Sequence, residues 1–100
     1  MTRQRLPNRR PCETFGFSHS GMQYTASYGF DHLDQPKELF LSGGKAGSLV
    51  EAITCDASTA ISIALQNNIS PAELAHSVVR NPDGSPASPI GAVLDDMVKA

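Results

Sequence analysis

The sequence has few of the local signals that identify an enzyme or a membrane protein. It contains no tryptophan and only two cysteines, Cys12 and Cys55, with no C-x-x-C pair, so a zinc site would need ligands from histidine. No stretch approaches the roughly 18 apolar residues of a membrane span, and the arginine-containing start is not followed by the apolar run of a secretory signal. We therefore expect a cytoplasmic protein with reduced thiols.

Catalytic and metal-binding motifs are also missing. No G-x-S-x-G or H-E-x-x-H spacing occurs, and His19, His32 and His76 fall in a predicted turn, a loop and a helix. Neither cysteine stands beside a convincing base. We predict no catalytic residue, no metal ligand and no cofactor. Cys55 is interpreted as a half-buried thiol, and Asp95-Asp96 as part of a solvated helix face.

Positive charge is concentrated at the start of the chain. The formal net charge of −2 is too small to indicate a nucleic-acid partner by itself. Residues 1–11 are polar and contain proline, and they hold half of the lysines and arginines: Arg3, Arg5, Arg9 and Arg10. We predict a flexible basic arm over residues 1–11 and a single domain over residues 12–100. The arm is either a solvated tail or a contact for phosphate or for an acidic partner surface.

Alternating apolar and polar residues predict three strands between Cys12 and Ser42. Residues 14–18 and 22–30 alternate on either side of a turn at Ser20-Gly21, which is typical of an antiparallel hairpin. Residues 38–41 form a third alternating run. Three aromatic side chains, Tyr24, Tyr28 and Phe30, share the apolar face, where we interpret them as core rather than as a platform for stacking bases.

Helical spacing begins after the third strand. Ser48 and Glu51 form a capping box, and Asn67-Asn68 is a plausible stop. Between them, apolar residues recur every three or four positions, which predicts one amphipathic helix with this stripe as its buried face: Leu49, Ile53, Ala57, Ala60, Ile61, Ala64 and Leu65. We expect this central helix to cover the apolar face of the sheet.

Two further helices are predicted after Ser70-Pro71 and Ser88-Pro89, because each pair places a capping serine before a proline at the first helical position. The element order is therefore βββααα. This predicts an α+β fold, in which a three-stranded antiparallel sheet is followed by three helices and the long central helix packs on the sheet.

The corner between the third strand and the central helix is the best candidate binding site. It reads Gly43-Gly44-Lys45-Ala46-Gly47-Ser48 and opens into a helix N-terminus, where free N–H groups and the helix dipole favour an anion. It is not a P-loop, because Lys45 precedes Ala46. We hypothesise an anion or phosphate site formed by Arg9, Arg10, Gly44, Lys45, Gly47 and Ser48. The alternative is that the glycines only form a tight turn, with Lys45 in solvent.

An ordered set of short segments also resembles a known family, the TSCPD domain. This domain occurs near the C-terminus of adenosylcobalamin-dependent (class II) ribonucleotide reductases and in short standalone bacterial proteins. The resemblance covers about residues 5 to 96, and Asn68 stands where the family usually has glycine. The segments that carry the resemblance are Leu6-Pro7-Asn8-Arg9-Arg10, Glu13-Thr14-Phe15, Tyr24-Thr25-Ala26, Glu38-Leu39-Phe40-Leu41, Lys45-Ala46-Gly47-Ser48 and Ala60-Ile61-Ser62-Ile63-Ala64-Leu65-Gln66.

The resemblance implies an accessory role, because the reductase's catalytic barrel, thiyl-radical cysteine and cobalamin site are absent from a chain of 100 residues. The first hypothesis is a non-catalytic module that docks on a ribonucleotide reductase, on another nucleotide enzyme or on a second copy of itself. An exposed sheet edge or the alanine-rich helix would provide the contact. The second is a small binding protein for phosphate, nucleotide or nucleic acid. An independent enzyme is the least favoured reading.

Overall fold

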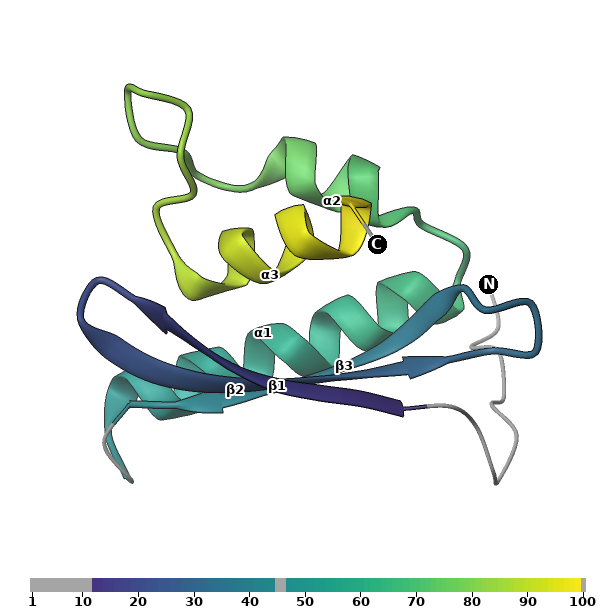
Figure 1. Ribbon diagram of the computed structural model, residues 1–100, viewed down its shortest axis with the longest axis horizontal. Coiled ribbons are helices and arrows are strands. Elements are labelled where there is room, and N and C mark those ends of the chain that lie inside the picture. The colour runs from purple at the N-terminus through teal and green to yellow at the C-terminus, as the bar shows by residue number, and fades with distance from the viewer. Residues whose placement is uncertain (1–11, 45–46, 100) are drawn as a thin grey trace.

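Three antiparallel strands precede three helices in the described part of the chain, residues 12–44 and 47–99 of a computed structural model. This confirms the predicted α+β class and element order. Figure 1 shows α2 and α3 together on one side of the sheet, and α1 running along β3. The elements are β1 (Cys12–His19), β2 (Met22–Phe30), β3 (Pro36–Gly43), α1 (Leu49–Gln66), α2 (Pro71–Ser77) and α3 (Pro89–Lys99).

The sheet has the order β1-β2-β3, so β1 and β3 are its two outer strands. Ser20 and Gly21 join β1 to β2 with φ values of 52° and 80°. Two consecutive positive φ values define a type I′ turn, whose twist suits a tight hairpin. The hairpin predicted from the alternation is therefore confirmed. The β2–β3 ladder is regular from Tyr24↔Gly43 to Gly29↔Glu38 and shifts register between Gly29 and Phe30.

One face of the sheet is apolar and buried, as the alternation predicts. Tyr24 and Tyr28 are both buried, which confirms that they belong to the core. Apolar side chains from all three described helices pack against this face: Ile61, Leu65, Ala75, Val93, Leu94 and Met97. The opposite face carries short polar side chains, and there Thr14 and Ser27 form a hydrogen bond of 2.8 Å across the β1–β2 pair.

The long helix packs against the sheet, but the prediction of its buried stripe is wrong. Leu49 and Ile53 at the start of that stripe are 75% and 57% exposed. The buried residues of α1 lie roughly a third of a turn away and are mainly polar: Thr54, Ser58, Ile61, Ser62, Leu65 and Gln66. Only Ile61 and Leu65 belong to both sets. Hydrophobic spacing alone therefore misidentifies the face that α1 turns toward the sheet.

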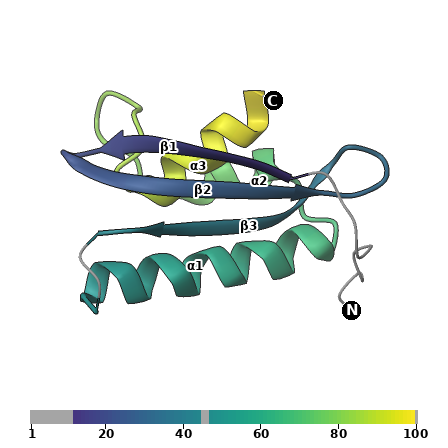
Figure 2. The same cartoon turned by 60° about the horizontal axis from the view of Figure 1, so that its bottom comes forward.

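The polar face of α1 is buried because it supplies hydrogen bonds to the outer edge of β3. The backbone N–H of Leu39 donates to Ser62 Oγ at 2.9 Å, and Leu39 O is an acceptor for the same hydroxyl at 2.9 Å. Gln66 Nε2 donates to Lys37 O at 3.0 Å. An outer strand presents unpaired N–H and C=O groups, and each such group needs a partner when it is buried. Ser62 and Gln66 therefore act as a substitute for a fourth strand. Figure 2 shows α1 running beside β3, where such a strand would lie.

A buried lysine fixes the other end of this contact. Lys37 is only 6% exposed, and its Nζ donates to Leu65 O at 3.2 Å and to Asn68 Oδ1 at 3.0 Å. A cation at a helix C-terminus is stabilised by the free carbonyls and by the helix dipole. Asn68 has a φ of 67°, so it ends the helix in the left-handed conformation expected of Asn67-Asn68. Lys37 thereby ties β3 to the last turn of α1.

The three predicted helix starts are confirmed. Ser48, Ser70 and Ser88 accept hydrogen bonds from the backbone N–H groups of Glu51, Glu73 and Gly91 at 3.1–3.2 Å. A serine at the N-cap satisfies one of the donors that a helix start leaves without a partner.

The contact between Ser62 and Leu39 gives a stability prediction. Ser62→Ala removes the only hydroxyl shared by the Leu39 N–H and C=O groups, so urea unfolding should show a loss of about 1–3 kcal/mol. Thr59→Ala is the matched control, because Thr59 is exposed on the same helix and bonds only the carbonyl of Cys55. Equal losses for both variants would contradict the proposed role of Ser62.

Candidate functional site

The corner between β3 and α1, residues 43–48, contains a tight turn at the start of α1. A side chain of the protein already accepts a hydrogen bond from one of the backbone N–H groups there. Gly44 and Gly47 have φ values of 76° and 78°, which only glycine adopts readily. The carboxylate of Glu51 accepts the N–H of Gly47 at 3.0 Å, and Ser48 Oγ accepts the N–H of Glu51. The capping box thus reaches back one residue further than predicted, and it places a negative charge at the helix start.

The structure describes only part of the hypothesised anion site. Gly44, Gly47 and Ser48 lie where the sequence predicts, at the entry to α1. Arg9, Arg10 and Lys45 lie outside the described residues, as does the predicted arm over residues 1–11. The anion site therefore stays a prediction. Any anion bound there would compete with the Glu51 carboxylate for the N–H of Gly47.

Gly43 has a packing role that the sequence does not reveal. It pairs with Tyr24 across the ladder, and a Cβ at this position would lie 2.3 Å from Tyr24 Cδ1. The tyrosine ring thus covers the space above a glycine, an arrangement that pins strand register. This role accounts for one of the three glycines of the corner without a ligand.

Three residues of the stripe that was expected to be buried, Leu49, Ile53 and Ala60, are exposed instead. We define the outer face of α1 by five exposed apolar residues: Leu49, Val50, Ile53, Ala60 and Ile63. Large apolar side chains that recur on one exposed helix face are uncommon unless the face contacts a partner. The helix has no lysine or arginine, but Asp56 is exposed three positions after Ile53 and four before Ala60, so it lies on the same face. The outer face is therefore a mainly apolar strip that carries one negative charge.

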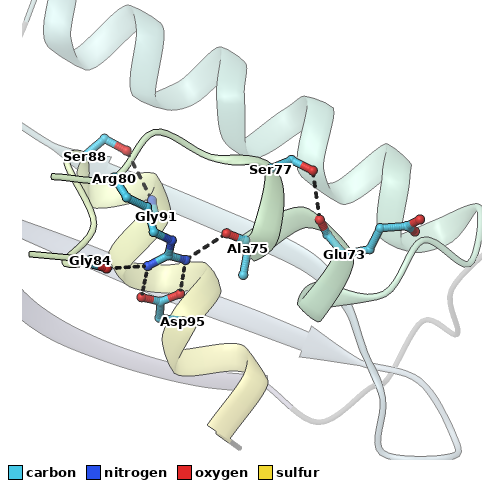
Figure 3. A network of polar contacts seen from close by, with 8 residues as sticks. All are labelled: Glu73, Ala75, Ser77, Arg80, Gly84, Ser88, Gly91 and Asp95. Atoms are coloured by element: carbon cyan, nitrogen blue, oxygen red, sulfur yellow. Dashed lines mark hydrogen bonds and ion pairs between the residues drawn. The ribbon is translucent and has the colours of Figure 1, made fainter. Parts of the chain in front are cut away.

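A polar network holds α2, the loop after it and α3 together (Figure 3). The Arg80 guanidinium donates to both Asp95 oxygens, at 2.6 and 2.9 Å, and also to Ala75 O and Gly84 O. This is a bidentate ion pair, in which the two planar groups fix each other's orientation. Asp95 is therefore more than part of a solvated face, because its ion pair ties α3 to the loop after α2.

The neighbouring acid, Asp96, also has a partner in the fold. Tyr28 Oη donates to Asp96 Oδ2 at 2.7 Å and lies 3.3 Å from Val93 O. Burial raises the pKa of Tyr28, and the Asp96 carboxylate raises this pKa further. The tyrosine therefore stays neutral and donates a hydrogen bond to Asp96, which anchors α3 to β2. Asp95 and Asp96 thus both help to hold α3 in place on the rest of the domain.

Histidines and cysteines do not converge in the part of the chain that the structure describes. His19 Nε2 lies 3.2 Å from Pro86 O, while His32 and His76 are exposed on a loop and on α2. No group of three metal-binding side chains occurs among the described residues. The interpretation of Cys55 as half-buried is wrong, because this thiol is exposed on α1.

These observations define a class of protein: a small α+β domain with an exposed apolar helix face and, among its described residues, no assembled metal site. No described helix combines the length and apolarity needed to cross a bilayer. The family model that matches the chain is the TSCPD domain, over residues 2–97. The chain belongs to this family. Neither curated proteins nor solved structures gave a significant match.

Several carboxylates give the domain a predictable response to acid. Hydrogen bonds from the backbone N–H groups of Gln35 and Leu33 lower the pKa of Asp31. Hydrogen bonds from Ser85 lower the pKa of Asp83, and a hydrogen bond from Arg80 lowers the pKa of Asp95. The unfolded chain therefore binds protons at a higher pH than the folded chain does. The free energy of unfolding should be flat above about pH 5 and should fall as the pH drops through the ordinary carboxyl range near 3.8.

Urea unfolding at a series of pH values between 3 and 7 measures this dependence. Asp95→Asn should lower stability at neutral pH and should reduce the slope at acidic pH, because one of the lowered pKa values is removed. A domain that became more stable as the pH fell from 5 to 3 would contradict the assignment.

Proposed function

We propose that this chain is a non-catalytic docking module, which binds a larger protein through the outer face of α1. The observation that carries the proposal is the exposure of large apolar side chains along one helix face, with Leu49 at 75% and Ile53 at 57%. Burying one such side chain contributes about 1.5–3 kcal/mol. Recognition of one apolar helix face by a complementary surface is a common mode of protein association.

The proposed partner is a ribonucleotide reductase or another enzyme of nucleotide metabolism. Membership of the TSCPD family supports this choice, together with the resemblance to the C-terminal accessory domain of class II reductases. The polar contacts of the domain also support a docking role rather than catalysis. Asp95, Asp96 and Tyr28 serve the packing of α3 on the rest of the fold.

Substitution at the centre of the outer face tests the docking function. Ile53→Asp places a charge in an apolar contact, so it should weaken binding to a purified class II reductase at least tenfold while the chain stays folded. Thr59→Asp is the matched control, since Thr59 is also exposed on α1 but is a polar residue outside the outer face. Calorimetry measures affinity, and circular dichroism checks folding. Equal affinities for Ile53→Asp and the unaltered chain would refute docking through this face.

The alternative function is phosphate binding at the glycine corner and the basic arm. Its structural support is the pair of left-handed glycines, Gly44 and Gly47, at the start of an 18-residue helix. On this alternative, Arg9, Arg10 and Lys45 neutralise the ligand. Glu51 weakens the case because its carboxylate occupies the Gly47 N–H.

Salt dependence separates the two functions. If the corner binds phosphate, affinity for pyrophosphate or a short single-stranded oligonucleotide should fall steeply between 50 and 300 mM salt, and Lys45→Ala should reduce it several-fold. Docking through the apolar outer face should change little over this range. Unchanged affinity of Lys45→Ala for both probes would eliminate the corner as the phosphate site.

A further inference from the structure

The two outer strands of the sheet are treated differently. The edge of β3 is sealed by Ser62 and Gln66 of α1, whereas no described residue bonds to the outer edge of β1. Figure 2 shows β1 at the margin of the sheet opposite α1. Long outer strands are usually protected by charged side chains, above all lysine, by proline or by a bulge, because an open edge invites another strand. The eight residues of β1, CETFGFSH, contain no lysine and no proline, their pairing to β2 is regular, and Glu13 near one end is their one acid.

The hydrogen-bond pattern between the strands shows which backbone groups of β1 point away from β2. Leu39 directs its N–H and C=O away from β2, toward Ser62, so Tyr28↔Leu39 is a pair without mutual hydrogen bonds. Tyr28 therefore directs its backbone groups toward Glu13 of β1. By alternation, odd-numbered residues of β1 bond to β2. The even-numbered residues Thr14, Gly16 and Ser18 present their N–H and C=O groups to the outside, and all three are exposed.

We propose that β1 pairs antiparallel with β1 of a second copy, about a two-fold axis at Gly16, to give a continuous six-stranded sheet. In this register Gly16 faces Gly16 of the other copy and exchanges both backbone hydrogen bonds with it. Thr14 faces Ser18 of the other copy in the same way. A two-fold contact between identical strands is self-complementary and closed, which is the commonest symmetry of protein dimers.

Side-chain pairing across the two strands selects this register. With the axis at Gly16, Phe15 lies opposite Phe17 of the second copy twice, once on each side of the axis, and Glu13 lies opposite the His19 imidazole. A register shifted by one residue on each strand, with the axis at Phe15, would instead place Glu13 opposite Phe17. Aromatic pairs stabilise neighbouring strands, whereas a carboxylate against a phenyl ring does not.

A recess beside the free edge provides room for the second copy's aromatic side chains. A cavity of about 170 Å³ lies between β1 and α3, lined by Phe15, Phe17, Ala92, Val93 and Asp96. Both phenylalanines are only half-buried, although Phe15 meets Tyr28 edge to face at 5.3 Å between ring centres and Phe17 stacks on Tyr24 at 5.6 Å. Addition of a second β1 places another Phe15 and Phe17 against these rings and covers them. The inference deepens the docking function by naming one partner, but it uses a different surface from the outer face of α1.

Proline at the axis tests the pairing. Gly16→Pro removes an N–H that points away from β2, so it should abolish the dimer without breaking the β1–β2 ladder. Gly16→Ala is the matched control, because it keeps the N–H and its Cβ would lie 3.7 Å from the nearest atom, Tyr24 O. Sedimentation equilibrium should show a dimer for the unaltered chain and Gly16→Ala, and a monomer for Gly16→Pro. Circular dichroism verifies that each variant is folded.

Cross-linking tests the register independently of the proline variant. On a Cys12→Ser, Cys55→Ser background, Thr14→Cys and Ser18→Cys chains are mixed and treated with a short bifunctional maleimide. The mixture should give cross-linked dimers. Each chain alone should give few, because identical positions then lie about 14 Å apart along the strands.

Three results would overturn the proposal: a monomeric unaltered chain at 100 µM, a dimer that survives Gly16→Pro, or cross-links that are no more frequent in the mixture than in single chains. A dimer that is lost on Ile53→Asp but kept in Gly16→Pro would assign self-association to the outer face of α1. Failure of the reductase to bind would refute the proposed partner while leaving the β1 dimer intact.

Discussion

The architecture depends on hydrogen bonds between the side chains of one helix and the backbone of one strand. Ser62 and Gln66 satisfy the outward N–H and C=O groups of Leu39 and Lys37, and Lys37 in turn binds the last turn of α1. An open sheet of three strands has two edges with unpaired backbone groups, and in this domain a helix covers one of these edges. Because that closure requires polar groups, the polar side of α1 turns inward and its apolar stripe turns toward solvent.

This constraint links the fold to its candidate function. An amphipathic helix normally packs its apolar stripe inward, and then its outer surface is polar and unremarkable. Here Ile61 and Leu65 retain enough apolar contact to join the core, while Leu49 and Ile53 do not. The exposed stripe is therefore a consequence of how β3 is sealed. It leaves the domain with an apolar surface for which docking on another protein is a direct use.

Most of the fold could be predicted from the sequence, because the signals were local. The alternation in β2, the turn at Ser20-Gly21 and the serine caps each depend on neighbouring residues, and all were confirmed. The buried face of α1 was wrong because it depends on Leu39, which lies 23 positions from Ser62 in the chain. A run of Thr54, Ser58, Ser62 and Gln66 at steps of four was the available signal. The partners of Asp95 and Asp96 were missed for the same reason, since Arg80 and Tyr28 come from other parts of the fold.

The two proposed contact surfaces lie on opposite margins of the sheet, which makes them compatible. The outer face of α1 lies beyond β3, and the free edge of β1 lies beyond β2 (Figure 2). Pairing through β1 would therefore leave the α1 surfaces of both copies exposed. Two linked copies can then engage two sites of a symmetric partner at once, and the second contact forms at a raised effective concentration. If β1 pairs as proposed, one sheet edge would let a small domain bind a two-fold partner more tightly than one helix face allows.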